Sequence, residues 1–295
     1  MAANNRQSIF STSMNKRIRL ASLFLALAIA ASSAQAGAIT VKGSDTMVIL
    51  AQKWAEVYMG RHPDIKIQVT GGGSGVGFAA LQDQKTDLAD ASRPIKAKET
   101  EACVKAFGKR PKEYKVCVDG LSVYVNNSNP IKQLSVGQLS DIFTGKTTNW
   151  KELGGSDTQI RLYSRENSSG TYEFFKEHVL KGKDFAASAQ TMPGTAALVQ
   201  AVENDIKGIG YGGAAYGAGA KTIAVSKETG APAILPSEET VLNQSYPIWR
   251  YLYVYVNPAL DKGEIASYLQ WMRSDEGQKV VKEINYYPLP KDMRD

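Results

Sequence analysis

The sequence has few of the side chains that most often bind metals or act as general bases. Its 295 residues include two cysteines and two histidines. Neither His62 nor His178 has metal-ligand spacing with a cysteine, and a serine hydrolase would have only these two candidates for its base. We therefore predict no metal site, no cofactor and no enzymatic activity.

Apolar runs long enough to span a membrane are also lacking. The run Ala21–Ala31 has eleven residues, whereas a membrane-spanning helix needs roughly 20. Lys16, Arg17 and Arg19 lie just before this run, and Ala34-Gln35-Ala36 follows it as a small-residue cleavage site. We predict a cleaved signal peptide over residues 1–36. Because no cysteine near this site could take a lipid, we expect the mature protein to be free in the periplasm.

The sequence has little excess charge once this segment is set aside. Residues 1–36 contain four of the 35 Lys and Arg residues and none of the 29 Asp and Glu residues, which leaves 31 basic against 29 acidic side chains. Scattered pairs such as Lys109-Arg110 do not make the clustered basic surface that is typical of nucleic-acid binding. We expect no nucleic-acid partner.

Both cysteines lie beyond the predicted signal peptide. Cys103 and Cys117 have thirteen residues between them, and an exported protein meets an oxidising compartment. We therefore predict one disulfide between them. Closing a loop of this length would stabilise the fold by about 3 kcal/mol in the chain-entropy model.

Strand and helix patterns alternate along the rest of the chain, which indicates an α/β fold with largely parallel sheets. We expect strands at 39–41, 65–69, 88–91, 121–126, 160–165, 209–211 and 251–257. We expect helices at 50–61, from about 78, and at 135–142, 172–180, 195–203 and 264–284, the last with a break near 274–277. Ser135 and Gln138 form a capping-box pattern at the start of one helix.

The 259 residues after the signal peptide exceed the usual size of one domain, so two lobes are expected. The strands at 121–126 and 251–257 divide the chain so that one lobe contains both ends. We predict one lobe from residues 37–122 and 255–295 and a second lobe from residues 123–254. The two crossing strands would form the hinge.

Three loops rich in Gly, Ser and Thr each end a strand and precede a helix. They are Gly43–Thr46, Gly71–Gly77 and Arg165–Thr171. The first turn of a helix has unpaired N–H groups and a partial positive charge, and the hydroxyl groups add further donors. One such loop is typical of an ordinary helix cap. Three loops at the carboxyl ends of strands predict a shared anion site, where the Arg165 guanidinium could bind two oxygens of a tetrahedral anion.

Together with Lys53-Trp54 and Ala91-Ser92-Arg93-Pro94, these loops resemble the periplasmic phosphate-binding proteins of ABC phosphate importers. The resemblance runs over nearly the whole chain after residue 36. It implies a type II Venus-flytrap fold in which two α/β lobes close on inorganic phosphate. It also implies that the protein delivers this phosphate to the permease of a membrane ABC importer. We expect the protein to be a monomer.

The resemblance further implies a set of phosphate-binding residues. One lobe would supply Ser44, Asp45, Thr46 and Ser74, and the other would supply Arg165, Ser169, Gly170 and Thr171. Some members of this family have an aspartate in place of Arg93, and that aspartate accepts the proton of hydrogen phosphate. Here Arg93 is expected to be a second cation, and Asp45 is the candidate proton acceptor. Alternatively, Asp45 is the N-cap of the helix through Tyr58.

Two other functions stay open from the residues alone. The chain could bind another tetrahedral oxyanion, such as sulfate or molybdate, or it could be a secreted phosphoester hydrolase. Gly208–Gly213 matches the dinucleotide-binding fingerprint, but small and glycine-rich residues follow it rather than an amphipathic helix. We therefore expect no nucleotide site there.

Overall fold

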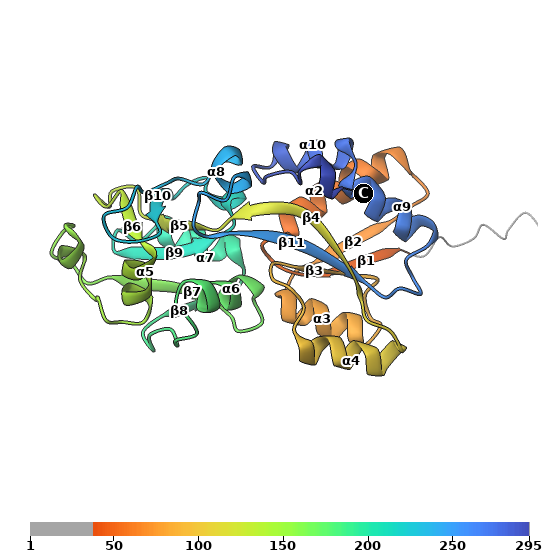
Figure 1. The fold of residues 1–295 in the computed structure, drawn as a ribbon, viewed down its shortest axis with the longest axis horizontal. Helices are drawn as coiled ribbons and strands as arrows, with labels where there is room; N and C mark the ends of the chain where they lie inside the picture. The colour runs from red at the N-terminus through yellow and green to blue at the C-terminus, as the bar shows by residue number, and fades with distance from the viewer. Residues whose placement is uncertain (1–37, 295) are drawn as a thin grey trace, which may run out of the picture. The chain divides into compact units, whose positions relative to one another are not determined.

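The computed structural model describes residues 38–294, so the predicted signal peptide lies outside the described residues. Within them, the chain forms two lobes, each built on a β-sheet that has helices on both faces (Figure 1). Both sheets are mixed, which corrects the prediction of largely parallel sheets. In the first sheet β11 runs antiparallel to both of its neighbours, and in the second sheet β5 does the same. No helix among residues 38–294 is long and apolar enough to cross a membrane.

The first sheet has the strand order β2-β1-β3-β11-β4. Its strands are β1 (Ile39–Gly43), β2 (Ile67–Thr70), β3 (Leu88–Ala91), β4 (Lys112–Gly120) and β11 (Trp249–Val256). Helices α2 (Val48–Arg61), α9 (Gly263–Arg273) and α10 (Asp275–Glu283) cover one face, and α3 (Ser74–Gln82) and α4 (Ala97–Phe107) cover the other (Figure 1).

Side chains on β11 alternate between the two faces of this sheet, as a strand requires. Leu252 and Val254 pack in the core under α2, α9 and α10, whereas Tyr253 and Tyr255 pack against Phe78 of α3. The sheet is therefore buried on both faces, and its functional groups are those at the strand ends.

The second sheet has the strand order β6-β10-β5-β9-β7-β8. Its strands are β5 (Ser122–Val125), β6 (Gln133–Ser135), β7 (Arg161–Arg165), β8 (Gln190–Met192), β9 (Gly208–Gly212) and β10 (Lys221–Ser226). Its helices are α5 (Val136–Phe143), α6 (Gly170–His178), α7 (Thr195–Glu203) and α8 (Glu238–Leu242). Short 3₁₀ turns occur at Trp150–Leu153, Ala214–Tyr216 and Lys291–Met293. The core on the α5 and α6 face contains Val123, and the core on the α7 face contains Tyr124.

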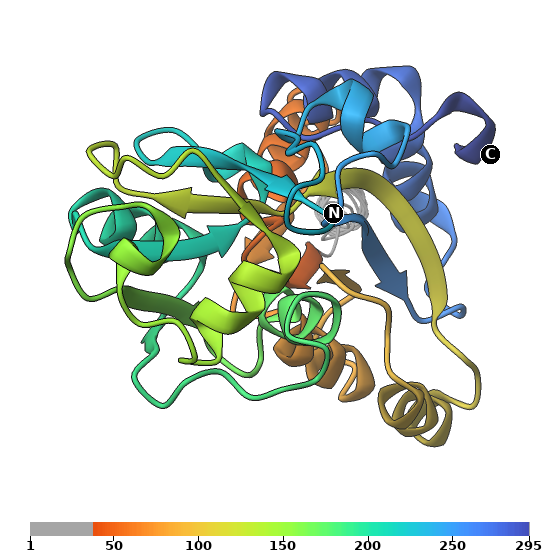
Figure 2. The ribbon, with the colours of Figure 1, turned by 60° about the vertical axis from the view of Figure 1, so that its left-hand side comes forward.

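The chain passes between the sheets twice, and the two crossings lie side by side. Leu121 separates β4 from β5, and the return crossing leads into β11 at Trp249 (Figures 1 and 2). Leu121 N–H donates to the Ile248 carbonyl at 2.8 Å, and the Tyr246 hydroxyl donates to the Leu121 carbonyl at 2.8 Å. Residues 249–254 were predicted to belong to the second lobe, but they pair with β4 in the first sheet.

The predicted disulfide is wrong, because Cys103 and Cys117 are both free thiols. The segment between them is not a surface loop. It contains the end of α4 and most of the long strand β4, which places Cys117 in the buried part of the sheet. Cys117 packs in the core under α2, α9 and α10, whereas Cys103 lies on α4, which covers the other face of the same sheet (Figure 1), so the sheet separates the two thiols.

Asp90 on β3 carries a buried carboxyl group that should make stability depend on pH. It alternates with Ala89 and Ala91 of the α3 face, so it points to the opposite side, and it is 4% exposed. Burial raises the pKa of this carboxyl group from 3.8 to about 8. The folded state therefore binds the proton more tightly than the unfolded state. The free energy of unfolding falls as the pH rises from about 4 to about 8.

The Asp90→Asn variant keeps the shape of this side chain but removes its titration. We expect it to match the wild type near pH 4 and to be more stable by several kcal/mol near pH 8, because each unit of pKa shift corresponds to about 1.4 kcal/mol. Urea unfolding of both proteins across this range measures the difference. A stability difference that does not change with pH would contradict the assignment.

Candidate functional site

The ends of three parallel strands bring the first part of the site together. β1, β2 and β3 end at the same edge of the sheet, where Ser44, Ser74 and Ser92 lie. The Ser44 hydroxyl donates to Ser92 Oγ at 2.9 Å, and Ser92 N–H donates to Ser74 Oγ at 3.0 Å. All three side chains are buried.

The second part of the site is the N-terminal turn of α6. Ser169 caps this helix, and its Oγ accepts a hydrogen bond from Tyr172 N–H at 3.3 Å. Thr171 Oγ1 lies 2.6 Å from Thr46 Oγ1 and 3.3 Å from Ser92 Oγ. Hydroxyl groups from the two lobes are thus in direct contact. We refer to Ser44, Thr46, Ser74, Ser92 and Thr171 as the hydroxyl cluster.

Gly170 permits this close approach of the lobes. A Cβ atom at this position would clash with Ser74 Oγ and lie 2.8 Å from Ser92 Oγ. The backbones also meet nearby, since Gly75 N–H donates to the Ser168 carbonyl at 2.9 Å. The first turn of α6 therefore directs its N–H groups and its partial positive charge toward the hydroxyl cluster.

Arg165 lies at the end of β7, and its side chain is 1% exposed. It donates to Thr195 Oγ1 at 2.9 Å and to Asp45 Oδ2, across the lobes, at 2.7 Å. Asp45 Oδ1 accepts from Gly72 N–H at 2.8 Å. Asp45 is not a helix cap, because α2 begins at Val48 with Met47 as its N-cap. The structure thus brings Asp45 and Arg165 together.

Arg93 is placed differently from the other predicted site residues. Its guanidinium forms ion pairs with Glu99 at 2.7 Å and with Glu173 at 2.6 Å, and it also donates to the Pro94 carbonyl at 2.9 Å. Its Nη1 and Nη2 atoms donate hydrogen bonds to Glu99 and Pro94, whereas its Nε atom makes no hydrogen bond and meets Glu173 as an ion pair. Arg93 therefore follows Ser92 of the hydroxyl cluster in the sequence, but its guanidinium pairs with carboxylates and not with the hydroxyl groups.

Arg250 belongs to the site although sequence reasoning missed it. It donates to Thr171 Oγ1 at 3.0 Å and to the Ser92 carbonyl at 3.0 Å. Asp119, its partner across β4 and β11, accepts from the same guanidinium at 2.8 Å, and both side chains are buried. The signal in the sequence is a charged residue inside an apolar and aromatic strand, which needs a buried partner.

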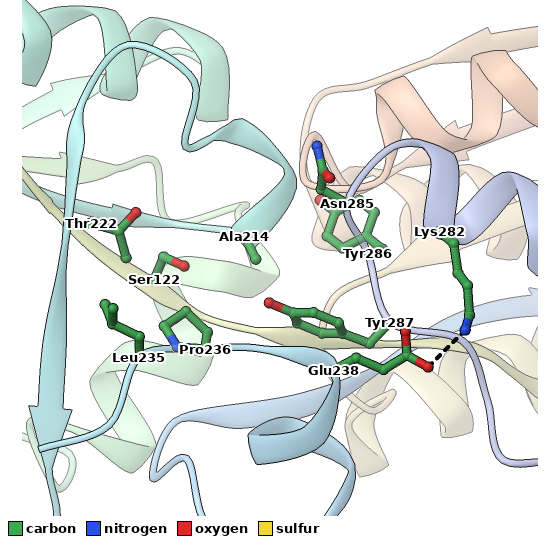
Figure 3. Close-up of a pocket in the computed structure, with 10 residues that line it drawn as sticks. All are labelled: Ser122, Ala214, Thr222, Leu235, Pro236, Glu238, Lys282, Asn285, Tyr286 and Tyr287. Carbon is green, nitrogen blue, oxygen red and sulfur yellow. Dashed lines mark hydrogen bonds and ion pairs between the residues drawn. The ribbon is translucent and has the colours of Figure 1, made fainter.

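A separate pocket of about 430 Å³ lies on the other side of Tyr286 (Figure 3). Ser122 and Thr222 face it from one lobe, and Lys282 from the other lobe forms an ion pair with Glu238 at 2.8 Å. The Tyr286 hydroxyl donates to the Thr46 carbonyl. None of the predicted anion-binding residues lines this pocket.

The chemistry of the site is that of an oxyanion receptor. Two buried guanidinium groups, several hydroxyl groups and a helix N-terminus offer donors, and Asp45 offers one acceptor beside Arg165. Residues 38–294 contain no group of three His, Cys, Asp or Glu side chains arranged to hold a metal ion.

The sequence matches known proteins along most of its length. Residues 28–276 match the family model of the PBP superfamily domain. The chain is 35% identical to the phosphate-binding protein PstS of Pseudomonas aeruginosa, with 93% of this chain and 95% of that protein covered. It is 31% identical to PstS of Staphylococcus epidermidis, with 86% and 80% covered.

Solved structures give the same result. A substrate-binding protein assigned to a phosphate ABC transporter of Clostridium perfringens, solved with bound phosphate, matches with a TM-score of 0.79 and 28% identity over 86% of this chain and all of that one. An ABC-type phosphate transport receptor from Vibrio cholerae matches with a TM-score of 0.66 and 25% identity over 85% of this chain and all of that one. The chain therefore belongs to the phosphate-binding protein family of the PBP superfamily and has the two-lobed type II fold of that family.

Proposed function

We propose that the protein captures inorganic phosphate between its two lobes and delivers it to the permease of an ABC importer. The observation that carries this proposal is the convergence of anion-binding groups from both lobes on one buried point. Arg165 and the first turn of α6 come from one lobe, and Asp45 and most of the hydroxyl cluster come from the other. The names of the relatives support phosphate as the anion.

Phosphate suits this set of groups because it needs both donors and an acceptor. Its unprotonated oxygens would accept from Arg165 and from the hydroxyl groups of Ser44, Thr46, Ser74, Ser169 and Thr171, and from the N–H groups at Gly170 and Thr171. A hydrogen phosphate ion also carries one proton, which the Asp45 carboxylate can accept. Sulfate has no such proton at neutral pH, so the same carboxylate would repel it.

Binding is proposed to occur by hinge closure. The lobes would be residues 37–122 with 255–295 and residues 123–254, adjusted so that all of β11 moves with the first sheet. In the structure the hydroxyls of Thr46 and Thr171 bond to each other. A phosphate ion between the lobes would replace such bonds with its own, and the crossings at Leu121 and Ile248 would bend.

The remaining features of the proposal concern where the protein acts. We propose that residues 1–36 are removed as a signal peptide, that no lipid is attached, and that the mature protein acts as a periplasmic monomer without a nucleic-acid partner. The phosphoester hydrolase is disfavoured by the two histidines. His62 stacks on Tyr58 with ring centroids 4.2 Å apart, and His178 stacks on Phe174 with centroids 4.0 Å apart.

Phosphate should stabilise the purified mature protein, freed of bound anion, against heat. A ligand that binds the folded state alone adds about 4 kcal/mol at a thousandfold excess over its Kd. Calorimetry with phosphate, sulfate and molybdate should then give one tight site for phosphate. A chromogenic phosphoester incubated with the protein should not be hydrolysed. An unchanged melting temperature at millimolar phosphate would refute phosphate capture, and tighter binding of sulfate or molybdate would reassign the anion.

Asp45 and Arg165 should have separable effects on binding. Arg165→Ala removes the guanidinium that serves any oxyanion, so we expect affinity for phosphate and for sulfate to fall together, by about 100-fold or more. Asp45→Asn removes the acceptor for the phosphate proton. We expect it to weaken phosphate by about 10- to 100-fold while weakening sulfate much less, so that discrimination relaxes.

Glu166→Gln is a matched control for these two variants. Glu166 also contacts Arg165, at 3.3 Å from Nε, but from a partly exposed position. We expect both affinities to stay within a few-fold of the wild type. If Asp45→Asn weakens both anions equally, Asp45 acts by orienting Arg165 and is not the proton acceptor.

A further inference from the structure

The rim of the site carries an ion cluster that joins the lobes without belonging to the hydroxyl cluster. Glu173 lies in the first turn of α6, in the second lobe. Its carboxylate is 2.6 Å from Arg93 Nε and 2.6 Å from Lys96 Nζ, both in the first lobe. We call Arg93, Lys96, Glu99 and Glu173 the rim cluster.

Contacts within the first lobe hold Arg93 in place. Glu99 accepts from two separate nitrogens of Arg93, at 2.8 and 2.7 Å, and also accepts from Lys96 N–H at 2.8 Å. The Arg93 guanidinium lies 4.9 Å from the centre of the Phe78 ring. All of these contacts lie within the first lobe, so they hold Arg93 in place independently of the second lobe. The contact of Arg93 Nε with Glu173 is an ion pair and not a hydrogen bond, so it acts through charge.

The burial of this contact makes it stronger than an ordinary surface pair. The Arg93 side chain is 6% exposed and that of Glu173 is 21% exposed, whereas Lys96 is 55% exposed. Exposed pairs contribute little because water screens them, and partly buried pairs are screened less. Arg93 should therefore contribute most of the attraction for Glu173, and Lys96 a smaller part.

The rim cluster is tied by the chain to the hydroxyl cluster on both sides. Ser92 directly precedes Arg93, and Thr171 precedes Glu173 by two residues. Ser92 Oγ and Thr171 Oγ1 lie 3.3 Å apart. Any motion that separates these hydroxyl groups also pulls Glu173 away from Arg93.

We propose that Glu173, through Arg93 and Lys96, is a latch that stabilises the closed lobes and sets how long the anion stays bound, without touching it. This inference rests on the proposed capture of phosphate. Because it acts through the equilibrium between open and closed lobes, the latch should affect every oxyanion equally. By the same linkage, bound anion should strengthen the latch.

The test is the dissociation rate of phosphate from Glu173→Gln, measured by stopped-flow with the full mature chain. We expect dissociation to be about 5- to 30-fold faster, with the association rate nearly unchanged, as for most losses of a closing contact. Affinities for phosphate and sulfate should fall by the same factor. Lys96→Gln should give a smaller effect, and the double variant should be no worse than Glu173→Gln alone.

Glu177→Gln is the matched control, because it removes the same charge from an exposed position on the same helix. It should leave the dissociation rate unchanged. Raising the salt concentration should narrow the gap between wild type and Glu173→Gln. A dissociation rate for Glu173→Gln within twofold of the wild type, or an effect as large for Glu177→Gln, would overturn the latch.

Small-angle scattering separates this proposal from the proposed function. Without phosphate, the wild type should be more compact at low salt than at high salt, and Glu173→Gln should lose this response. If the wild type binds no phosphate but shows this difference, phosphate capture fails and the latch stands. If the wild type binds phosphate and the two proteins scatter identically at both salt concentrations, the latch fails and phosphate capture stands.

Discussion

The paired crossings between the lobes constrain the rest of the structure. A single flexible tether would allow the lobes many relative orientations, each with an entropic cost to order. Here Leu121 and Ile248 are hydrogen-bonded, so the lobes can bend about the crossings but have little freedom to slide or turn. The loops at the ends of β1, β3 and β7 therefore meet in one fixed arrangement each time the lobes close. Close approaches such as that of Gly170 to Ser74 are possible because the hinge returns the lobes to the same place.

Buried arginines at the interface are balanced by carboxylates in every case described. Arg165 pairs with Asp45, Arg250 with Asp119, and Arg93 with Glu99 and Glu173. An unpaired guanidinium in such a place would cost several kcal/mol, and each pair also fixes the direction in which the remaining N–H groups point. Two of these arginines have a partner in the other lobe. Closure of the lobes thus pairs buried charges as well as hydroxyl groups. These contacts form together, so closure is cooperative.

Local signals predicted most of the fold and the three loops of the site, and long-range pairing decided the rest. Glycine-rich turns after strands predicted the loops that contain Ser44, Ser74 and Gly170, and the cap of α5 at Ser135 is confirmed. β4 was missed because its first residues are charged and exposed, as in many edge strands, and read as a loop. That miss led to the wrong disulfide. Arg250 lies far in sequence from the three loops, and Glu173 lies far from Arg93, so no local pattern could connect the members of either pair.

The free thiols have a consequence for how the first lobe reaches its native state. Cys103 and Cys117 are both fully buried, and burial raises the pKa of the Cys103 thiol to about 11. Neither sulfur forms a disulfide, so folding of this lobe requires no oxidant and no enzyme that rearranges disulfides. The packed thiols are also poor nucleophiles while they stay covered. The rate at which an alkylating reagent modifies them therefore reports how often α4 and β4 open.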